Sequence, residues 1–471
     1  MYDFISIEFW GAAQEVTGSK HLITAHDGTK ILLDCGLVQS SDDPDVNRHF
    51  GFPVHDIDLL IVSHAHIDHT GNIPNLVKQG FKGKILSTAA TFDVLNVMLA
   101  DSAKIQEADV EFINKKRKRE GRKPLQPLYD MDDVEKCFSL FHPIKMDEYF
   151  DINENIRLLF TDAGHILGSA CITLEFKKAD VVTRLFFSGD VGRYRDRILK
   201  APEDFPQADY ILLESTYGNR LHDDTENAEQ KLLDAVNETC IQNRGKLLIP
   251  AFSLGRTQEI VYALDRMRTE GKLPKVKVFV DSPLSTAATK IMRNHTNYFN
   301  EDILEYMEQD PDPFAFPNLY YTKSVEESKA INEDDEPAII IAASGMMDAG
   351  RIKHHLTRYI EDPKNTLLIV GYCEPSTIGG KLLAGHKNIQ IYGREFEVNA
   401  KVEVISSYSA HADYSELMRF LNCQEPEKVD TVFLVHGVLE AQEYFAEKLN
   451  EKGFKNVRIP FKSEAYKLKL K

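Results

Sequence analysis

The sequence has few of the features that mark secreted, membrane or disulfide-stapled proteins. Its 471 residues include only six cysteines, and no two of them lie at the close spacing of a zinc knuckle or a redox dithiol. No apolar run approaches the roughly 20 residues that span a membrane. The N-terminus lacks the basic start and apolar core of a secretory signal. We therefore expect a cytoplasmic protein with reduced thiols and no membrane contact.

Positive charge is also scarce. The chain has 56 Lys and Arg against 73 Asp and Glu, a formal net charge of −17. This excess of negative charge argues against a protein whose whole surface binds nucleic acid nonspecifically. The exception is one dense basic run between residues 115 and 123. Two interpretations stay open for this run, a solvated helix end or loop and a contact with a phosphate backbone.

Length and patterning predict an interrupted α/β architecture. The chain exceeds the usual limit for one hydrophobic core. Short β-rich runs recur between turn residues over 1–217, as in layered sheets. Over 218–404, helical periods alternate with single apolar strands, which is typical of βαβ units and a mainly parallel sheet. Short strands return over 405–471. We predict that a first domain (1–217) is interrupted by a second (218–404) and completed by the C-terminal segment.

Three histidines and an aspartate lie within the six residues 64–69, directly after an apolar strand. Neutral imidazole and carboxylate are ligands that suit zinc. His64 and His66 are two residues apart, so both can face one ion from an extended backbone. Asp68 and His69 lie past a turn and can reach a neighbouring ion. Because the chain holds only 16 histidines, chance gathering explains the segment poorly. The pattern predicts two adjacent metals.

This segment resembles the His-x-His-x-Asp-His loop of the metallo-β-lactamase superfamily. Ala65 stands where a glutamate would indicate the di-iron flavoprotein branch, so that branch is disfavoured. The resemblance implies an αββα sandwich and two zinc ions per chain. By the resemblance, the first ion is held by His64, His66 and His165, the second by Asp68, His69 and His436, and Asp190 bridges the two.

Asp34 matches the first motif of the superfamily in Leu32-Leu33-Asp34-Cys35-Gly36. The resemblance implies that its carboxylate orients a ligand and the nucleophilic water. Taken alone, Asp34 would be interpreted as an aspartate in the turn that ends a strand, and it is the complete set of motifs that favours the functional role. Metal identity also stays open at this stage, because mixed histidine and carboxylate sites accept manganese or iron as well as zinc.

Two adjacent divalent ions favour hydrolysis. A water held between them becomes hydroxide near neutral pH, and the ions neutralise charge on a phosphoryl or carbonyl oxygen. The metals alone do not distinguish these two electrophiles, so specificity depends on the rest of the chain.

A second resemblance, to the β-CASP branch of the superfamily, narrows the substrate. Its members insert an extra domain and process nucleic acids, and their additional motifs are matched by Glu214, His411 and His436. A histidine near a carboxylate has a raised pKa and can protonate a departing oxygen. We hypothesise that His411 does so with Glu214 as its partner, and the alternative is that His411 only orients Glu214 or a ligand. Members with a histidine at the last motif act on RNA, so His436 favours RNA over DNA.

Further residues could handle phosphate where strands enter helices. A hydroxyl, backbone amides and a guanidinium could meet an anion at such a helix N-terminus. Each segment could equally be a capped helix start. The candidates, which resemble β-CASP segments lining the nucleic-acid cleft, are Ser253, Arg256, Ser344, Arg351 and, more weakly, Ser409.

The leading hypothesis is a zinc-dependent ribonuclease that hydrolyses single-stranded RNA through a metal-bridging hydroxide and leaves a 5′-phosphate and a 3′-hydroxyl. Endonucleolytic and 5′-exonucleolytic action both stay open, as does a homo-oligomer. The alternatives are a DNA nuclease of the same branch, a small-ester hydrolase and a catalytically silent RNA-binding subunit. An ester hydrolase would not need the region from 218 to 404, and a silent subunit would be expected to have lost ligands, yet the motif residues are complete.

Overall fold

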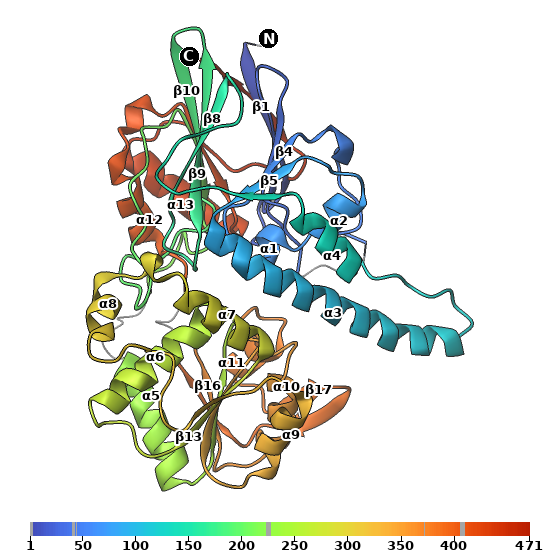
Figure 1. Ribbon diagram of the computed structural model, residues 1–471, viewed down its shortest axis with the longest axis vertical. Helices are drawn as coiled ribbons and strands as arrows, with labels where there is room; N and C mark the ends of the chain where they lie inside the picture. Colours follow the sequence, from blue (N-terminus) through green and yellow to red (C-terminus); the bar gives the residue numbers. More distant parts are fainter. Residues whose placement is uncertain (1–2, 40–42, 44, 223–227, 372, 406–409) are drawn as a thin grey trace. The chain divides into compact units, whose positions relative to one another are not determined.

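The protein has an α/β fold that divides into two compact units. The computed structural model describes residues 3–39, 43, 45–222, 228–371, 373–405 and 410–471. One unit comprises Met1–Leu221 and His411–Lys471, and the other comprises His222–Ala410 (Figure 1). The predicted α/β class with a parallel second sheet is therefore confirmed. Among the described residues, no helix combines the length and the apolar character needed to cross a membrane.

The first unit contains two seven-stranded sheets. One has the order β22-β1-β2-β3-β4-β5-β6, antiparallel from β22 to β3 and parallel from β3 to β6. Its strands are β1 (Phe4–Gly11), β2 (Lys20–Thr24), β3 (Lys30–Leu33), β4 (Leu59–Ile61), β5 (Lys84–Ser87), β6 (Phe141–Pro143) and β22 (Ala465–Lys469). The last strand of the chain thus completes the sheet begun by the first.

The other sheet has the order β21-β20-β11-β10-β9-β8-β7. It is antiparallel from β7 to β10 and parallel from β10 to β21. Its strands are β7 (Phe150–Asp151), β8 (Ile156–Asp162), β9 (Ala170–Lys178), β10 (Val181–Phe187), β11 (Tyr210–Glu214), β20 (Thr431–Val435) and β21 (Val457–Arg458). The central strands β11 and β20 come from segments more than 200 residues apart, so the C-terminal segment belongs to this unit.

Side chains on these central strands alternate between two hydrophobic cores, because successive residues of a strand point to opposite faces. Leu212 and Phe433 lie in the core between the two sheets. Leu213 and Leu434 lie in the core on the outer face, where they pack with residues of α12 (Tyr414–Phe420) and α13 (Leu439–Lys452). Both faces are apolar, which explains why the sequence of each strand is a continuous apolar run.

Helices cover the outer face of the other sheet as well, completing an αββα sandwich (Figure 1). They are α1 (Ile67–Thr70), α2 (Ile73–Lys78), α3 (Ala89–Arg119) and α4 (Met131–Phe138). The charged stretch 92–136 is expected to be helical, but it is not one helix, and α3 ends at Arg119. Gly121 has a left-handed φ of 67°, and Pro124 and Pro127 follow in the connection, so helix cannot continue.

The second unit is built on a six-stranded parallel sheet of order β14-β13-β15-β12-β16-β19. Its strands are β12 (Lys246–Pro250), β13 (Lys277–Asp281), β14 (Leu319–Tyr321), β15 (Ala338–Ala342), β16 (Thr366–Ile369) and β19 (Lys401–Val404). A separate hairpin joins β17 (Asn388–Ile391) to β18 (Arg394–Glu397). The helices of this unit are α5 (Ala228–Val236), α6 (Arg256–Thr269), α7 (Pro283–Arg293), α8 (Glu301–Met307), α9 (Val325–Glu333), α10 (Ile352–Tyr359) and α11 (Ile378–Leu383).

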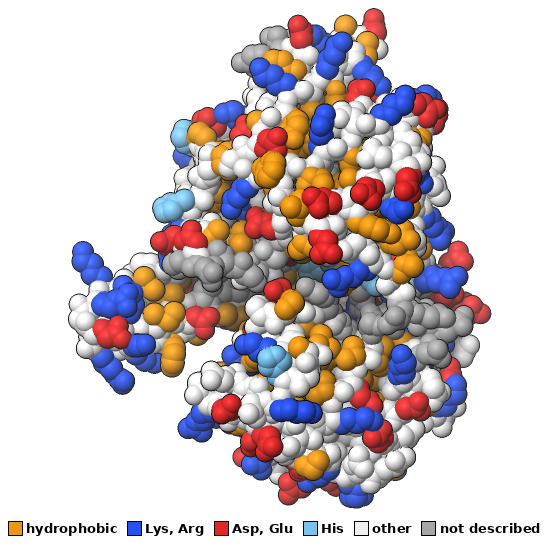
Figure 2. Space-filling model, turned by 180° about the vertical axis from the view of Figure 1, so that it is seen from behind, with side chains coloured by type: hydrophobic (Ala, Val, Ile, Leu, Met, Phe, Trp, Pro, Cys, Tyr) orange, Lys and Arg blue, Asp and Glu red, His pale blue; other side chains and the backbone are white. Residues whose placement is uncertain are grey.

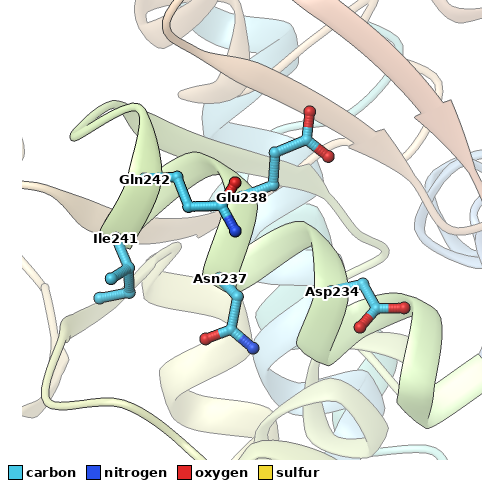
Figure 3. A pocket seen from close by; sticks show the side chains of 5 residues that line it. All are labelled: Asp234, Asn237, Glu238, Ile241 and Gln242. Atoms are coloured by element: carbon cyan, nitrogen blue, oxygen red, sulfur yellow. The ribbon is translucent and has the colours of Figure 1, made fainter.

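A hollow of about 470 Å³ lies against the helical segment formed by α5 and its π-helical continuation η3 (Asn237–Gln242). Figure 3 shows its lining, and all of the lining side chains come from this one segment. Two of them, Asp234 and Glu238, are acidic, and none is basic. The hollow includes none of the predicted site residues and does not suit a polyanion.

Candidate metal centre

Ten predicted site residues lie together in the first unit. Nine of them lie at the carboxyl ends of β3, β4, β8, β10, β11 and β20, and the tenth lies just ahead of α12. They are Asp34 after β3, His64, His66, Asp68 and His69 after β4, His165 after β8, Asp190 after β10, Glu214 at the end of β11, His436 after β20 and, beside them, His411. The αββα sandwich therefore brings together donors from distant stretches of the chain.

The first group of donors consists of three histidines and one oxygen of Asp190. His66 Nδ1 lies 3.2 Å from His64 Nε2 and 3.1 Å from His165 Nε2. Asp190 Oδ2 lies 3.3 Å from His64 Nε2 and 3.5 Å from His165 Nε2. These four side chains face one point from three separate loops.

The second group uses the other oxygen of the same aspartate. Asp190 Oδ1 lies 3.2 Å from His69 Nε2 and 3.6 Å from His436 Nε2. Asp68 Oδ2 lies 3.3 Å from His436 Nε2. The carboxylate of Asp190 therefore contributes one oxygen to each group, which is the arrangement expected of a residue that bridges two ions.

These distances fit a metal better than they fit hydrogen bonding among the side chains. Four donors at about 2.0–2.1 Å from one zinc ion lie roughly 3.3–3.4 Å from one another in a tetrahedron, and the separations above range from 3.1 to 3.6 Å. His69 Nε2 and Asp190 Oδ1 are buried, and neither makes a hydrogen bond within the described part of the chain. Buried polar atoms of this kind call for a partner. The donor set therefore fits metal ions.

The protonation of the three histidines in the first group suits the same conclusion. Burial, followed by the charge of His69, lowers the pKa of His64 to about 3. Burial likewise lowers the pKa of His66 to about 4, and burial together with the charge of His411 holds the pKa of His165 well below its usual value. Neutral imidazole is the form that binds a metal. These three rings are therefore ready to coordinate at neutral pH.

Three residues hold the donors in place. Asp34 Oδ2 accepts from His69 Nδ1 at 2.7 Å, and Ser63 donates its backbone N–H and its hydroxyl to Asp34, both at 2.8 Å. Thr216 Oγ1 lies 3.0 Å from His436 Nδ1. Partners of this kind fix the ring orientation of a ligand. The sequence reasoning found Asp34 but missed Ser63 and Thr216, because short hydroxyl residues next to a motif carry no distinctive pattern.

His411 and Glu214 lie beside the two groups. His411 Nδ1 lies 3.2 Å from Glu214 Oε1 and 4.0 Å from Asp190 Oδ2. Glu214 is fully buried and also accepts from the backbone N–H of Val191 at 2.8 Å. One fifth of the His411 side chain is exposed, whereas those of His64 and His165 are fully buried. His411 is thus both held by a carboxylate and open to a substrate.

The sequence matches three family models in succession. These are a metallo-beta-lactamase superfamily domain over residues 23–207, a Beta-Casp domain over 257–382 and a Zn-dependent metallo-hydrolase RNA specificity domain over 395–460. Ribonuclease TTHA0252 of Thermus thermophilus is 33% identical to this chain, over 91% of it and 92% of the relative. The chain belongs to the β-CASP branch of the metallo-β-lactamase superfamily.

Other relatives come from an archaeon and an insect. Transcription termination factor FttA of Methanosarcina mazei is 31% identical over 92% of this chain and 67% of the relative. Cleavage and polyadenylation specificity factor 73 of Drosophila melanogaster is 31% identical over 92% of this chain and 60% of the relative. A crystal structure of a protein of unknown function from Enterococcus faecalis V583 covers 99% of this chain and is itself covered completely, with a TM-score of 0.54 and 12% identity. That likeness shows the fold alone.

The β-CASP unit holds four described candidates for substrate binding at the carboxyl edge of its parallel sheet. Ser253 follows β12, and its hydroxyl lies 3.2 Å from that of Ser282, which follows β13. Ser344 follows β15, the strand between them. Ligands of α/β proteins bind at this edge of a sheet. The fifth candidate, Ser409, lies outside the described residues, and all five roles stay predictions.

The two arginines among these candidates already have protein partners. Arg256 is buried and forms an ion pair with Glu259. Arg351 donates from Nη1 to Asp281 Oδ1 at 2.7 Å and from Nη2 to the carbonyl of Lys323 at 3.1 Å. Both guanidinium groups are therefore held in place by oxygens of the protein itself.

Asp281 anchors a buried polar network at this edge, and its replacement should destabilise the unit. Besides Arg351 and Thr322, it accepts from Ser328 Oγ at 2.6 Å and His355 Nε2 at 2.7 Å. Asp281→Ala leaves these donors, several of them buried, without an acceptor, and we expect a loss of about 3–5 kcal/mol in the free energy of unfolding. Calorimetry measures the change. Asp335→Ala, at an exposed position, should stay within about 0.5 kcal/mol, and a loss under 1 kcal/mol for Asp281→Ala would contradict the account.

Proposed function

We propose that this protein is a metal-dependent ribonuclease that hydrolyses the phosphodiester bonds of single-stranded RNA, leaving a 5′-phosphate and a 3′-hydroxyl. The observation that carries the proposal is the arrangement around Asp190, whose two oxygens face two separate groups of histidine and carboxylate donors. The names of the relatives, which include a ribonuclease and a cleavage factor, support RNA as the substrate.

Two zinc ions per chain are proposed as the native metals, with manganese or iron as substitutes. The first would be held by His64, His66 and His165 and the second by Asp68, His69 and His436, with Asp190 shared. When bound, divalent ions supply positive charge that activates water and offsets the charge developing on phosphoryl oxygens.

The chain's own residues would then manage the leaving group. As water attacks phosphorus, the bond between phosphorus and the 3′ oxygen breaks and that oxygen needs a proton. Glu214 holds His411 through Nδ1, so we assign the donation to the other ring nitrogen, Nε2. The departing oxygen becomes the 3′-hydroxyl, and the phosphate stays on the 5′ side. General acids of this type contribute roughly 10²–10⁴-fold to a rate.

The setting proposed for this activity is the cytoplasm. All six cysteines are free thiols, and five of them are buried. Unpaired cysteines are typical of reducing compartments, where single-stranded RNA is also available as a substrate.

The proposal predicts cleavage of RNA that depends on a divalent metal. Purified protein is incubated with 5′-labelled or 3′-labelled single-stranded RNA and with DNA of the same sequence, with and without a chelator. RNA should be cleaved at least about 100-fold faster than DNA, and the chelator should abolish cleavage until zinc or manganese is restored. Products should carry a 5′-phosphate. Cleavage that resists the chelator, or products ending in a cyclic 2′,3′-phosphate, would exclude this mechanism.

A circular RNA of the same sequence separates the two modes of attack. An endonuclease opens the circle, whereas a 5′-exonuclease acts only after a break has been introduced. A matched pair of linear RNAs with a 5′-phosphate or a 5′-hydroxyl then reports whether the 5′ end is recognised.

A further inference from the structure

The second half of helix α3 projects from the first unit as an arm. The buried residues of α3 end at Ala103, although the helix continues to Arg119. At 1.5 Å per residue, the segment from Ala103 to Arg119 extends the helix by roughly 24 Å beyond its last buried residue. Figure 1 shows α3 leaving the body of the unit and a non-helical segment returning beside it to α4. We define the basic arm as residues 104–126.

The end of the basic arm is fixed by specific contacts. The side chain of Asn114 bonds the backbone of Leu125 in both directions, with its amide donating at 2.9 Å and its carbonyl oxygen accepting at 2.8 Å. Arg117 Nε donates to the carbonyl of Lys123 at 2.7 Å. Gly121 closes the helix in a Schellman motif, in which the Arg122 backbone N–H reaches the Arg117 carbonyl at 2.9 Å. The returning non-helical segment is therefore held against the helix, and the tip keeps one shape.

The tip combines dense positive charge with an exposed aromatic ring. Residues 115–123 include seven cations and one anion, for a net charge of +6, whereas the whole chain carries −17. Lys115 and Lys116 are 68% and 81% exposed. Phe112, one turn before Lys116 on the same helix face, is 76% exposed. Figure 2 shows the Lys and Arg side chains around the end of α3 with hydrophobic side chains beside them.

A solvated helix end explains this composition poorly. One or two cations in the last turn are favoured by the helix dipole, but further cations three or four residues apart repel one another. Within the described residues, Lys118, Arg119 and Lys123 have no acidic partner. A large aromatic ring next to them adds unfavourable exposure. The tip therefore carries features that weaken the isolated fold and that suit a bound polyanion with flat apolar faces.

We propose that the basic arm is a second RNA-binding surface, separate from the metal centre, where Phe112 stacks on a base and Lys115, Lys116, Lys118 and Arg119 contact phosphates. Single-stranded nucleic acid is bound by this combination of aromatic faces and cations. The identity of the polyanion rests on the proposed function. Because the arm does not touch the reacting atoms, it acts on affinity and leaves the chemical step unchanged.

The test measures RNA binding without cleavage. Fluorescence anisotropy follows a 30-nucleotide single-stranded RNA in chelator, over a series of salt concentrations, for the parent protein and two variants. Neutralising the four cations to glutamine should weaken binding at least about tenfold and lower the slope of log affinity against log salt by about 2–3, since each phosphate contact on a single strand contributes about 0.7. Phe112→Ala should weaken binding about fivefold or more and leave the slope unchanged, because the ring is uncharged.

The matched control removes the same charge elsewhere on the first unit. Lys145, Lys428, Lys455 and Lys462 are exposed and scattered over different elements, and their replacement by glutamine should lower the salt slope by less than about 1. Single-turnover cleavage at saturating RNA should stay within about twofold of the parent in the arm variants. If the arm variants keep the parental affinity and the parental salt slope, the inference is wrong, and a protein is the partner left to consider for the arm. If the arm binds RNA but the protein never cleaves RNA, only the proposed function is wrong and the inference about the arm stands.

Discussion

Asp190→Ala should reduce RNA cleavage by roughly 10³-fold or more, because several kcal/mol of charge stabilisation depend on the metal pair. One of its oxygens lies 3.3 and 3.5 Å from donors of the first group, and the other lies 3.2 and 3.6 Å from donors of the second group. Without them, each group loses a negatively charged donor. We expect the purified variant to retain fewer than two ions per chain by elemental analysis.

Asp180→Ala is the matched control for this variant. Asp180 lies in the exposed turn that joins β9 to β10, at the opposite end of β10 from Asp190. Its removal should leave metal content and cleavage within about twofold of the parent, as expected for a surface change. An Asp190→Ala protein with two ions and more than a tenth of parental activity would show that the bridging position is not needed.

His411→Ala should lower the single-turnover cleavage rate by roughly 10²–10⁴-fold while metal content stays unchanged. The ring contacts Glu214, and His411 belongs neither to the donor group of His64, His66 and His165 nor to that of Asp68, His69 and His436. Its removal therefore deletes the proton donor and leaves the ligands in place. His142→Ala, at an exposed position of the same unit, should cleave like the parent. Loss of metal in His411→Ala, or an unchanged rate, would contradict the assignment.

The pH profile tests the same residue in another way. Burial opposes a charged ring, but the charge and hydrogen bond of Glu214 and the charges of Asp190 and Asp68 outweigh it and raise the pKa of His411 to about 9. A raised pKa keeps the proton on His411 at neutral pH and releases it as the pH rises through 9. Cleavage should therefore fall above pH 9, after subtraction of alkaline hydrolysis measured without protein. Glu214→Gln should move this decline to lower pH by about two units, and a rate that is flat to pH 10 would remove His411 as the acid.

The central strands could be predicted from sequence, and the connections could not. The strands Tyr210–Glu214, Thr431–Val435 and Ala338–Ala342 coincide with continuous apolar runs in the sequence, because they are buried on both faces. The exact end of α3 was harder to predict, since the basic residues around it are good helix formers. The left-handed turn at Gly121 and the contacts of Asn114 fix this end, and Pro124 and Pro127 keep the helix from resuming.

The candidate site shows the same division. Sequence motifs located the donors, and the structure brings His64, His165 and His436 into one region. What spacing could not give is which oxygen of Asp190 faces which group, or that Thr216 holds His436, because both depend on how two sheets pack. The partner of Arg351 is likewise a tertiary contact, because Asp281 lies on the separate strand β13. The pair of Arg256 with Glu259, by contrast, lies within one helix turn of α6.

The most direct test of the two-ion site is a zinc titration of the metal-free protein. Metal is removed with a chelator, zinc is added back in steps, and RNA cleavage is measured at each step together with bound zinc. The arrangement around Asp190 predicts that cleavage is absent without metal, rises with added zinc and reaches its plateau at two ions per chain. Full cleavage by the metal-free protein, or a plateau reached at one bound zinc ion per chain, would contradict the two-ion site.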